Sequence, residues 1–181
     1  HDDDVGDVVR AAEPRHQQCA ASRELQGGLW HSTHPDRFDK ILRSGAILPA
    51  PDIPDSERWS TLQGAKFYPY VRTIGGVSLF DFDGFDPEIY GQRFPMSSWF
   101  NFVPYRREWG CSVWIEIDRE QVAPQLISAP DLAARQNAEG AHLHKRMPQI
   151  EAAHLGPLPR TAFKRAFLVR HGDNELYALA C

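Results

Sequence analysis

The sequence has few cysteines, and they show none of the spacings that zinc sites or disulfide frameworks use. Cys19, Cys111 and Cys181 are the only three in 181 residues, and no CxxC pair occurs. An odd number at wide spacing indicates neither a disulfide-stapled domain nor a cysteine zinc site. Free thiols of this kind fit a reducing compartment, so we expect a cytoplasmic protein.

Long hydrophobic runs are also missing. No apolar run approaches the ~20 residues that a helix needs to cross a bilayer, and no charged segment followed by an apolar one opens the chain. We therefore expect neither a membrane span nor a signal segment, and no membrane partner.

The familiar motifs of nucleotide and hydrolase sites are absent. Neither GxGxxG nor GxxxxGK[ST] occurs, which excludes the usual glycine-rich phosphate loops. No GxSxG occurs either, and Ser78 lies in a predicted strand, so a nucleophile elbow is not indicated. The eight histidines include the close pairs His31 with His34 and His142 with His144. None falls into HExxH or a similar ligand spacing, so we expect no metal site.

What the chain does contain is enough apolar material for one domain. Of its residues 42% are hydrophobic and 24% are charged, and 181 residues are too few for two ordinary cores. Residues 1–28 contain few apolar positions, so we expect a partly ordered N-terminal arm there and a single domain over 29–181. The net charge of −4 is uneven, because residues 143–181 carry six basic and three acidic side chains. That basic part is either a solvated face or an anion-facing surface.

The stretch LWHSTHPDRFDKILRSGAILP predicts a short strand followed by a helix. Apolar residues at helical spacing, with a proline in the first turn, indicate a helix over 35–44. Thr33 and Asp36 resemble a capping box, and Gly45 supplies a left-handed stop.

Further segments predict more strands than helices. They are strands over 46–49, 75–82, 111–118, 149–155, 162–170 and 175–180, a surface loop over 49–66, a helical turn over 86–92 and a helix or loop over 129–146. The alternation in 111–118 puts Val113, Ile115 and Ile117 in the core and leaves the other face partly wet. The last three strands are expected to form an antiparallel meander. The fold class is therefore α+β.

Three segments, in family order, carry a resemblance. LWHSTHPDRFDKILRSGAILP resembles the first motif of the ADP-ribosyltransferase superfamily, in which an aromatic residue, a His, a small residue and a Thr precede a helix that ends in Gly. GGVSLF resembles the second motif, a strand that carries Tyr or Ser beside an aromatic residue. QIEAAHLGPLP resembles the third, a strand with the catalytic Glu followed by a Gly-Pro turn. The three segments span 29–159 and are most similar to the DarT-type DNA ADP-ribosyltransferases and their relatives.

The resemblance implies a fold and an activity. The fold would be a split antiparallel β core with a few short helices. The activity would be the NAD-dependent transfer of ADP-ribose to a macromolecular acceptor, either a nucleic acid or a protein, as in a toxin or defence effector with a neutralising partner. Cleavage of the nicotinamide–ribose bond passes through an oxocarbenium-like sugar. A nearby carboxylate therefore stabilises the transition state more than the bound substrate. Glu151 would take that role.

NAD, used as a substrate and without a metal, would be held by residues of the first two motifs. The resemblance implies that His31 donates to the adenosine ribose and that Ser32 and Thr33 lie near the nicotinamide end. The residue that stacks on the nicotinamide is usually Tyr. Here Ser78 occupies that position, and Phe80 lies on the same face two residues later.

Cations and an amide extend the candidate site. Arg72 is our candidate for the NAD pyrophosphate or ribose, with Arg43 as an alternative, because a guanidinium matches phosphate in a bidentate geometry. Strand alternation predicts that the residue two positions before Glu151 shares its face, and the resemblance implies that this residue helps to choose the acceptor. The acceptor-facing candidates are therefore Gln149, Lys145 and Arg146. Their charge is compatible with DNA or RNA.

Other interpretations stay open. The domain could bind a nucleotide or protein without catalysis, could hydrolyse NAD without transfer, or could be an RNA 2′-phosphotransferase, which needs a dense group of Arg and His. Taken singly, His31 is more typical of a buried or turn histidine, and Glu151 of the wet side of an edge strand. The joint occurrence of the three segments favours the transferase.

Overall fold

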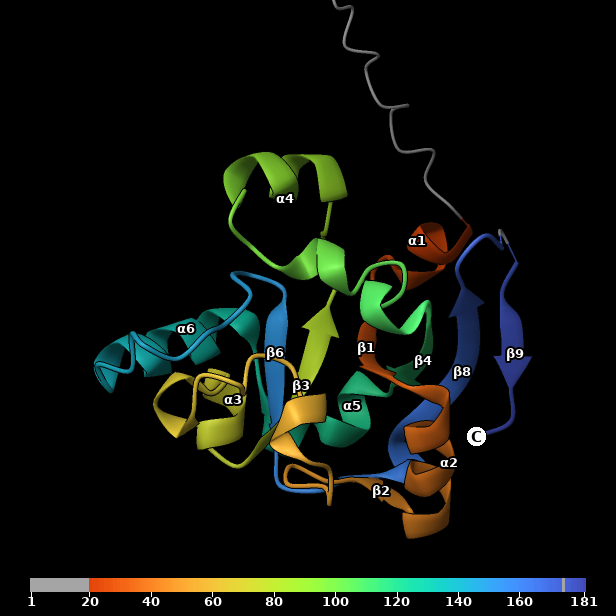
Figure 1. The fold of residues 1–181 in the computed structure, drawn as a ribbon, viewed down its shortest axis with the longest axis horizontal. Coiled ribbons are helices and arrows are strands. Elements are labelled where there is room, and N and C mark those ends of the chain that lie inside the picture. Colours follow the sequence, from red (N-terminus) through yellow and green to blue (C-terminus); the bar gives the residue numbers. More distant parts are fainter. Residues whose placement is uncertain (1–19, 174) are drawn as a thin grey trace, which may run out of the picture.

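The computed structural model describes residues 20–173 and 175–181, and a seven-strand sheet runs through its centre (Figure 1). Neighbouring strands are antiparallel, in the order β5-β6-β3-β1-β4-β8-β9. They are β1 (Leu29–Thr33), β3 (Gly76–Asp81), β4 (Cys111–Ile117), β5 (Leu126–Ile127), β6 (Glu151–Leu155), β8 (Phe163–Arg170) and β9 (Tyr177–Leu179). A second, two-stranded sheet pairs β2 (Ala46–Ile47) with β7 (Leu158–Pro159). The α+β class is confirmed.

Short helices surround this sheet. They are α1 (Ala20–Leu25), α2 (Pro35–Ser44), α3 (Tyr70–Thr73), α4 (Pro87–Arg93), α5 (Arg119–Val122) and α6 (Ala129–Ala138). In Figure 1, α3 and α6 lie beside β3 and β6, whereas α2 lies at the other end of the sheet. Helix α1 falls inside the expected arm over 1–28, and residues 1–19 lie outside the described part of the chain. Within the described part, no helix is long and apolar enough to span a membrane.

Helix α2 begins and ends at the predicted residues, but its N-cap differs from the prediction. The backbone of Gly45 is left-handed (φ 75°), and its N–H donates to the carbonyl of Ile41 at 3.0 Å. At the other end, His34 is the N-cap, and its Nδ1 accepts from the N–H of Asp36 at 3.2 Å. The predicted capping box is wrong, because Thr33 is still the last residue of β1 and pairs with Val113 in β4.

The sheet buries both of its faces. On one face Leu79 and Ile115 belong to a cluster that α2 covers, and on the other Phe82 and Trp114 belong to an aromatic cluster. The partly wet second face predicted for β4 is confirmed at the half-buried Glu116 but is wrong for Trp114, which is fully buried. The segment between α4 and β4 covers it, since the indole N–H donates to the carbonyl of Pro104 at 2.7 Å.

The late strands do not form the predicted meander. Strands β8 and β9 pair as a hairpin, as expected, but β6 lies between β3 and β5 and is separated from β8 by three strands. The Gly-Pro turn after β6 leads into β7, where Leu158 pairs with Ile47 of β2. Because the chain enters this small sheet after β6, the next strand of the large sheet, β8, pairs with β4 and not with β6.

The ladder between β1 and β3 is short, and this creates an opening in the sheet. Only Leu29 and Trp30 of β1 pair with β3, whereas the pairing of β1 with β4 continues to Thr33. Helix α3 packs closely against the start of β3, because a Cβ on Gly76 would lie 2.8 Å from the side chain of Val71. The second half of β1 and the first half of β3 therefore face each other without a ladder.

Candidate functional site

A cavity of about 560 Å³ lies at this opening. Its walls come from β1, β3, the start of β6, α2, α3 and the segment 46–61. This volume falls within the ~300–1,000 Å³ that is usual for ligand pockets. The predicted residues that line it are His31, Ser32, Thr33, Arg72, Ser78, Phe80 and Glu151.

The carboxylate of Glu151 is buried and held at both oxygens. Its residue is 1% exposed, and it opens β6 directly opposite Phe80 of β3. Oε1 accepts from the hydroxyl of Ser78 and Oε2 from the N–H of Met147, each at 2.7 Å. Burial raises the pKa of Glu151, although the two hydrogen bonds and the charge of Arg146 act in the opposite direction. The alternative of a wet edge strand is wrong, because β6 lies inside the sheet.

His31, on β1, contacts Ser78, the residue that donates to Glu151. Its Nδ1 lies 3.1 Å from the carbonyl oxygen of Ser78, and since a carbonyl only accepts, Nδ1 carries the proton. Burial lowers the pKa of His31, so the neutral ring is favoured. Nε2 is then an acceptor, and a ribose hydroxyl would donate to it, contrary to the predicted direction. Next to it, the hydroxyl oxygen of Ser32 is buried without a hydrogen-bond partner among the described residues.

The three motif residues thus form one hydrogen-bonded group. His31 reaches the backbone of Ser78, and the Ser78 side chain donates to Glu151. The three lie on β1, β3 and β6, which are neighbours only in the folded sheet.

A cationic wall faces this group. The lining arginines are Arg37, Arg58, Arg72 and Arg106. Arg72 lies 2.9 Å from the carboxylate of Asp55 and 3.7 Å from the ring centre of Tyr68. Sequence reasoning found only Arg72, because the other three belong to separate segments and form no motif. In the sequence, only the proline-rich loop over 49–66 indicates that further residues, such as Arg58, belong to the site.

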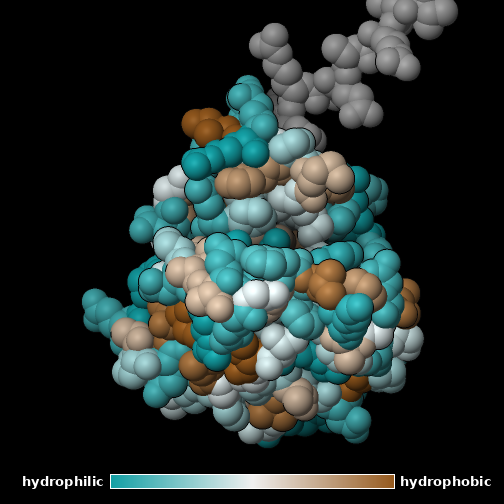
Figure 2. All heavy atoms as spheres, turned by 90° about the vertical axis from the view of Figure 1, so that its left-hand side faces the viewer, coloured by the Kyte–Doolittle hydropathy of each residue, from teal (hydrophilic) through white to brown (hydrophobic). Residues whose placement is uncertain are grey.

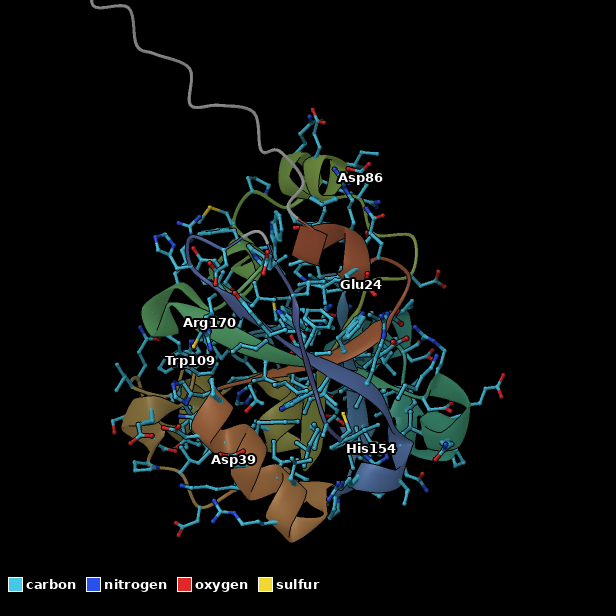
Figure 3. All side chains as sticks on the ribbon, turned by 90° about the vertical axis from the view of Figure 1, so that its right-hand side faces the viewer. Glu24, Asp39, Asp86, Trp109, His154 and Arg170 are labelled. Atoms are coloured by element: carbon cyan, nitrogen blue, oxygen red, sulfur yellow. The ribbon has the colours of Figure 1, made fainter. Side chains whose placement is uncertain are left out.

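The aromatic residues of the site differ in how much of each ring is exposed. The Phe80 ring is 5% exposed and packs against Phe102 and Trp114, at 5.7 and 5.3 Å between ring centres. Trp59 and Trp109 also line the cavity and are only half-buried. Figure 3 shows Trp109 near α2, and its ring contacts the His34 ring at 5.4 Å. These two indoles are better placed than Phe80 to stack on a ligand.

The three predicted acceptor-facing residues do not line the cavity. Gln149 has a left-handed backbone (φ 61°), is exposed and precedes β6. The prediction that strand alternation places it on one face with Glu151 is therefore wrong. Lys145 and Arg146 line a second depression, of about 620 Å³. Arg43 lines neither space and donates to the carbonyl of Asp39 in its own helix.

Within residues 20–173 and 175–181, no group of three His, Cys, Asp or Glu side chains could hold a metal ion. The polar groups of the cavity are instead the carboxylates of Asp52 and Glu151, the imidazole of His31, hydroxyls, the ammonium of Lys40 and guanidiniums. This set suits an anionic ligand with hydroxyl groups. In the comparisons with known proteins, no family model and no curated protein matches the sequence.

Proposed function

We propose that this protein is an NAD-dependent ADP-ribosyltransferase in which Glu151 supports the breaking of the nicotinamide–ribose bond. The observation that carries the proposal is the hydrogen-bonded group of His31, Ser78 and Glu151 at the floor of the cavity. The short ladder between β1 and β3 supports the split sheet that the resemblance implies.

The residues divide naturally between the parts of NAD. The pyrophosphate would meet the cationic wall. There, Arg58 lies in the loop over 49–66, and Arg72 pairs with Asp55 of the same loop. A ribose hydroxyl would donate to Nε2 of His31. The hydroxyl of Ser32, which has no partner in the described residues, would bond the carboxamide.

Glu151 would act on charge that develops during the reaction. As the C1′–N bond breaks, nicotinamide leaves as a neutral ring with the electron pair, and the ribose becomes an oxocarbenium-like cation. A carboxylate fixed by Ser78 and Met147 needs no reorientation to stabilise that cation. The acceptor then attacks C1′ and loses a proton, which Glu151 can take.

Incubation of the protein with labelled NAD and separate samples of DNA, RNA, 2′-phosphorylated RNA and cell-extract protein tests the proposal. We expect label on one acceptor. Free ADP-ribose alone would indicate a glycohydrolase, dephosphorylation of the RNA a 2′-phosphotransferase, and binding of unchanged NAD a catalytically silent domain.

Two glutamate variants locate the chemistry. Glu151→Gln preserves the shape of the side chain, and we expect it to lower the transfer rate by at least about 100-fold. Glu120→Gln is the matched control, because Glu120 is exposed on α5, away from the cavity, and should keep the wild-type rate. Full activity of the Glu151 variant would refute the assigned role.

A further inference from the structure

One buried tyrosine of α4 contacts the segment that leads to β6. Figure 2 shows that hydrophilic atoms dominate the side of the molecule on which α4 and α6 lie, with hydrophobic atoms between them. Tyr90 contributes little to that surface, because it is 5% exposed. Its ring packs against the rings of Phe85, Phe94 and Trp99, at 5.3, 5.0 and 6.0 Å between ring centres. These contacts fix the ring and therefore the position of its hydroxyl.

The hydroxyl of Tyr90 donates to the backbone just before β6. Its single proton goes to the carbonyl of Pro148 at 2.7 Å. Its oxygen lies 2.9 Å from the hydroxyl of Ser97, so Ser97 is the donor in that pair. Ser97 is itself buried, at 8% exposed. Both a donor and an acceptor function of the tyrosine hydroxyl are thus used, and they join α4 to the backbone at Pro148.

The turn from Met147 to Glu151 is closed by its own hydrogen bonds. The N–H of Met147 donates to the carboxylate of Glu151 at 2.7 Å, and the N–H of Glu151 donates to the carbonyl of Met147 at 3.2 Å. The N–H of Ile150 donates to the carbonyl of Pro148 at 2.8 Å. Gln149 between them has a left-handed backbone (φ 61°), which a residue with a side chain keeps only where its surroundings impose it. The shape of this turn therefore depends on contacts from outside it.

Two hydrogen bonds from neighbouring elements supply such contacts. The N–H of Asp81, in β3, donates to the carbonyl of Ile150 at 2.7 Å, and the hydroxyl of Tyr90 donates to that of Pro148. The second bond acts directly beside Met147. Because the ring of proline fixes φ, a restraint on the Pro148 carbonyl also restrains the peptide that joins it to Met147. The direction of the Met147 N–H is thereby coupled to α4.

We infer that Tyr90 is a positioning residue for Glu151 and acts through Pro148 and Met147, an inference that rests on the proposed function. Tyr90 does not line the cavity, so it would not contact NAD. Without its hydroxyl, the N–H of Met147 would be free to turn away from the carboxylate. Glu151 would then have to reorient as the sugar cation forms, which a fixed carboxylate avoids.

Steady-state kinetics of NAD cleavage by Tyr90→Phe test the inference. The variant keeps the ring and its packing and removes only the hydroxyl. We expect kcat to fall by about 10- to 100-fold, as for a misplacement of the reacting groups by ~1 Å. The KM for NAD should not change, because the residue lies outside the cavity.

Tyr70→Phe is the matched control. Tyr70 is also buried, and its hydroxyl donates to the carboxylate of Glu139 at 2.7 Å. Its side chain neither lines the cavity nor bonds the turn from Met147 to Glu151 in the described part of the chain. This variant loses a buried tyrosine hydroxyl as Tyr90→Phe does, and it should keep the wild-type kcat.

The titration of Glu151 gives a second measurement, made without NAD. The hydrogen bonds that Glu151 accepts and the charge of Arg146 lower its pKa, against the effect of burial. A misaligned Met147 N–H opposes burial less, so we expect a higher pKa of Glu151 in Tyr90→Phe than in wild type. Infrared difference spectra across pH measure this pKa, with Glu151→Gln to identify the carboxyl band. Tyr70→Phe should leave it unchanged.

The outcomes separate this inference from the proposed function. Equal kcat values for Tyr90→Phe and Tyr70→Phe, or an unchanged pKa of Glu151 in Tyr90→Phe, would overturn the positioning role. A higher KM with an unchanged kcat would also contradict it, because it would indicate a role in binding NAD. If the wild type does not cleave NAD, the transferase is refuted, and the pKa of Glu151 in the two variants still decides whether Tyr90 positions the carboxylate.

Discussion

At the scale of the residue, Glu151 is placed where a charge is unfavourable. It is 1% exposed and lies opposite Phe80, a member of the aromatic cluster, and burial raises its pKa. Two hydrogen bonds compensate only in part. Such an arrangement stabilises the protein less than a neutral side chain would, and this is common where a buried ionisable group serves a site.

The pH dependence of stability should show this. Because the pKa of Glu151 in the folded protein lies above that of the unfolded chain, the folded state binds more protons between the two values, and its stability falls as pH rises through that window. Glu151→Gln removes this dependence. Its amide oxygen can accept from the N–H of Met147, and its NH2 group can donate to the hydroxyl oxygen of Ser78. We expect the variant to melt at a higher temperature than wild type at pH 8 and at about the same temperature near pH 4, close to the ordinary pKa of Glu.

Calorimetric scans across that pH range measure the difference, with Glu120→Gln as control. A variant that melts lower than wild type at pH 8 would contradict the prediction. It would mean that the hydrogen bonds to Ser78 and Met147 outweigh burial.

At the scale of the element, the loop over 49–66 organises the cationic wall. This predicted surface loop contains short 3₁₀ turns at Asp55–Glu57 and, at its end, Ala65–Phe67. Thr61 is buried, and its hydroxyl bonds the carbonyls of Asp55 and Arg58. Arg72 ties α3 to this loop through Asp55. The loop is therefore held to itself at Thr61 and to α3 at Asp55.

Thr61→Val tests the role of this loop. The substitution removes the single hydroxyl proton that the carbonyls of Asp55 and Arg58 share, which costs on the order of 1–3 kcal/mol of unfolding free energy for a buried group. We expect faster proteolysis within the loop and a higher KM for NAD with a smaller change in kcat, because Arg58 loses its fixed backbone. Thr161→Val changes an exposed threonine far from the cavity and is the matched control. Equal KM values for the two variants would argue against a positioning role for the loop.

At the scale of the whole molecule, the sheet separates two apolar clusters. One contains Ile47 and lies towards α2 and the small sheet, and the other contains Phe82 and lies towards α4. Each cluster draws residues from strands far apart in the chain. Both rest on the same seven strands, so we expect them to unfold together.

The effects of two conservative core substitutions on the free energy of unfolding should therefore add, and the protein should still unfold in a single transition. Ile47→Val and Phe82→Leu are each expected to lower the free energy of unfolding by about 1 kcal/mol. Because the sites lie in separate clusters, the double variant should show the sum within about 0.5 kcal/mol. Urea unfolding followed by fluorescence and by far-UV circular dichroism measures this. Two separate transitions, or a large coupling, would show that the clusters are not joined as described.

Features that depend on local chemistry could be predicted from the amino-acid sequence. The bounds of α2 follow from helical spacing and from a glycine that adopts the left-handed backbone at Gly45, and the two faces of β3 follow from alternation. The order of the strands in the sheet could not be predicted in this way, because pairing joins residues far apart in the chain and depends on turns such as the one before Leu158. Tertiary contacts also bring the arginines of the cationic wall together from separate segments, and Gln149 lies outside β6. Burial and long-range pairing, which no local pattern encodes, therefore set the geometry of the candidate site.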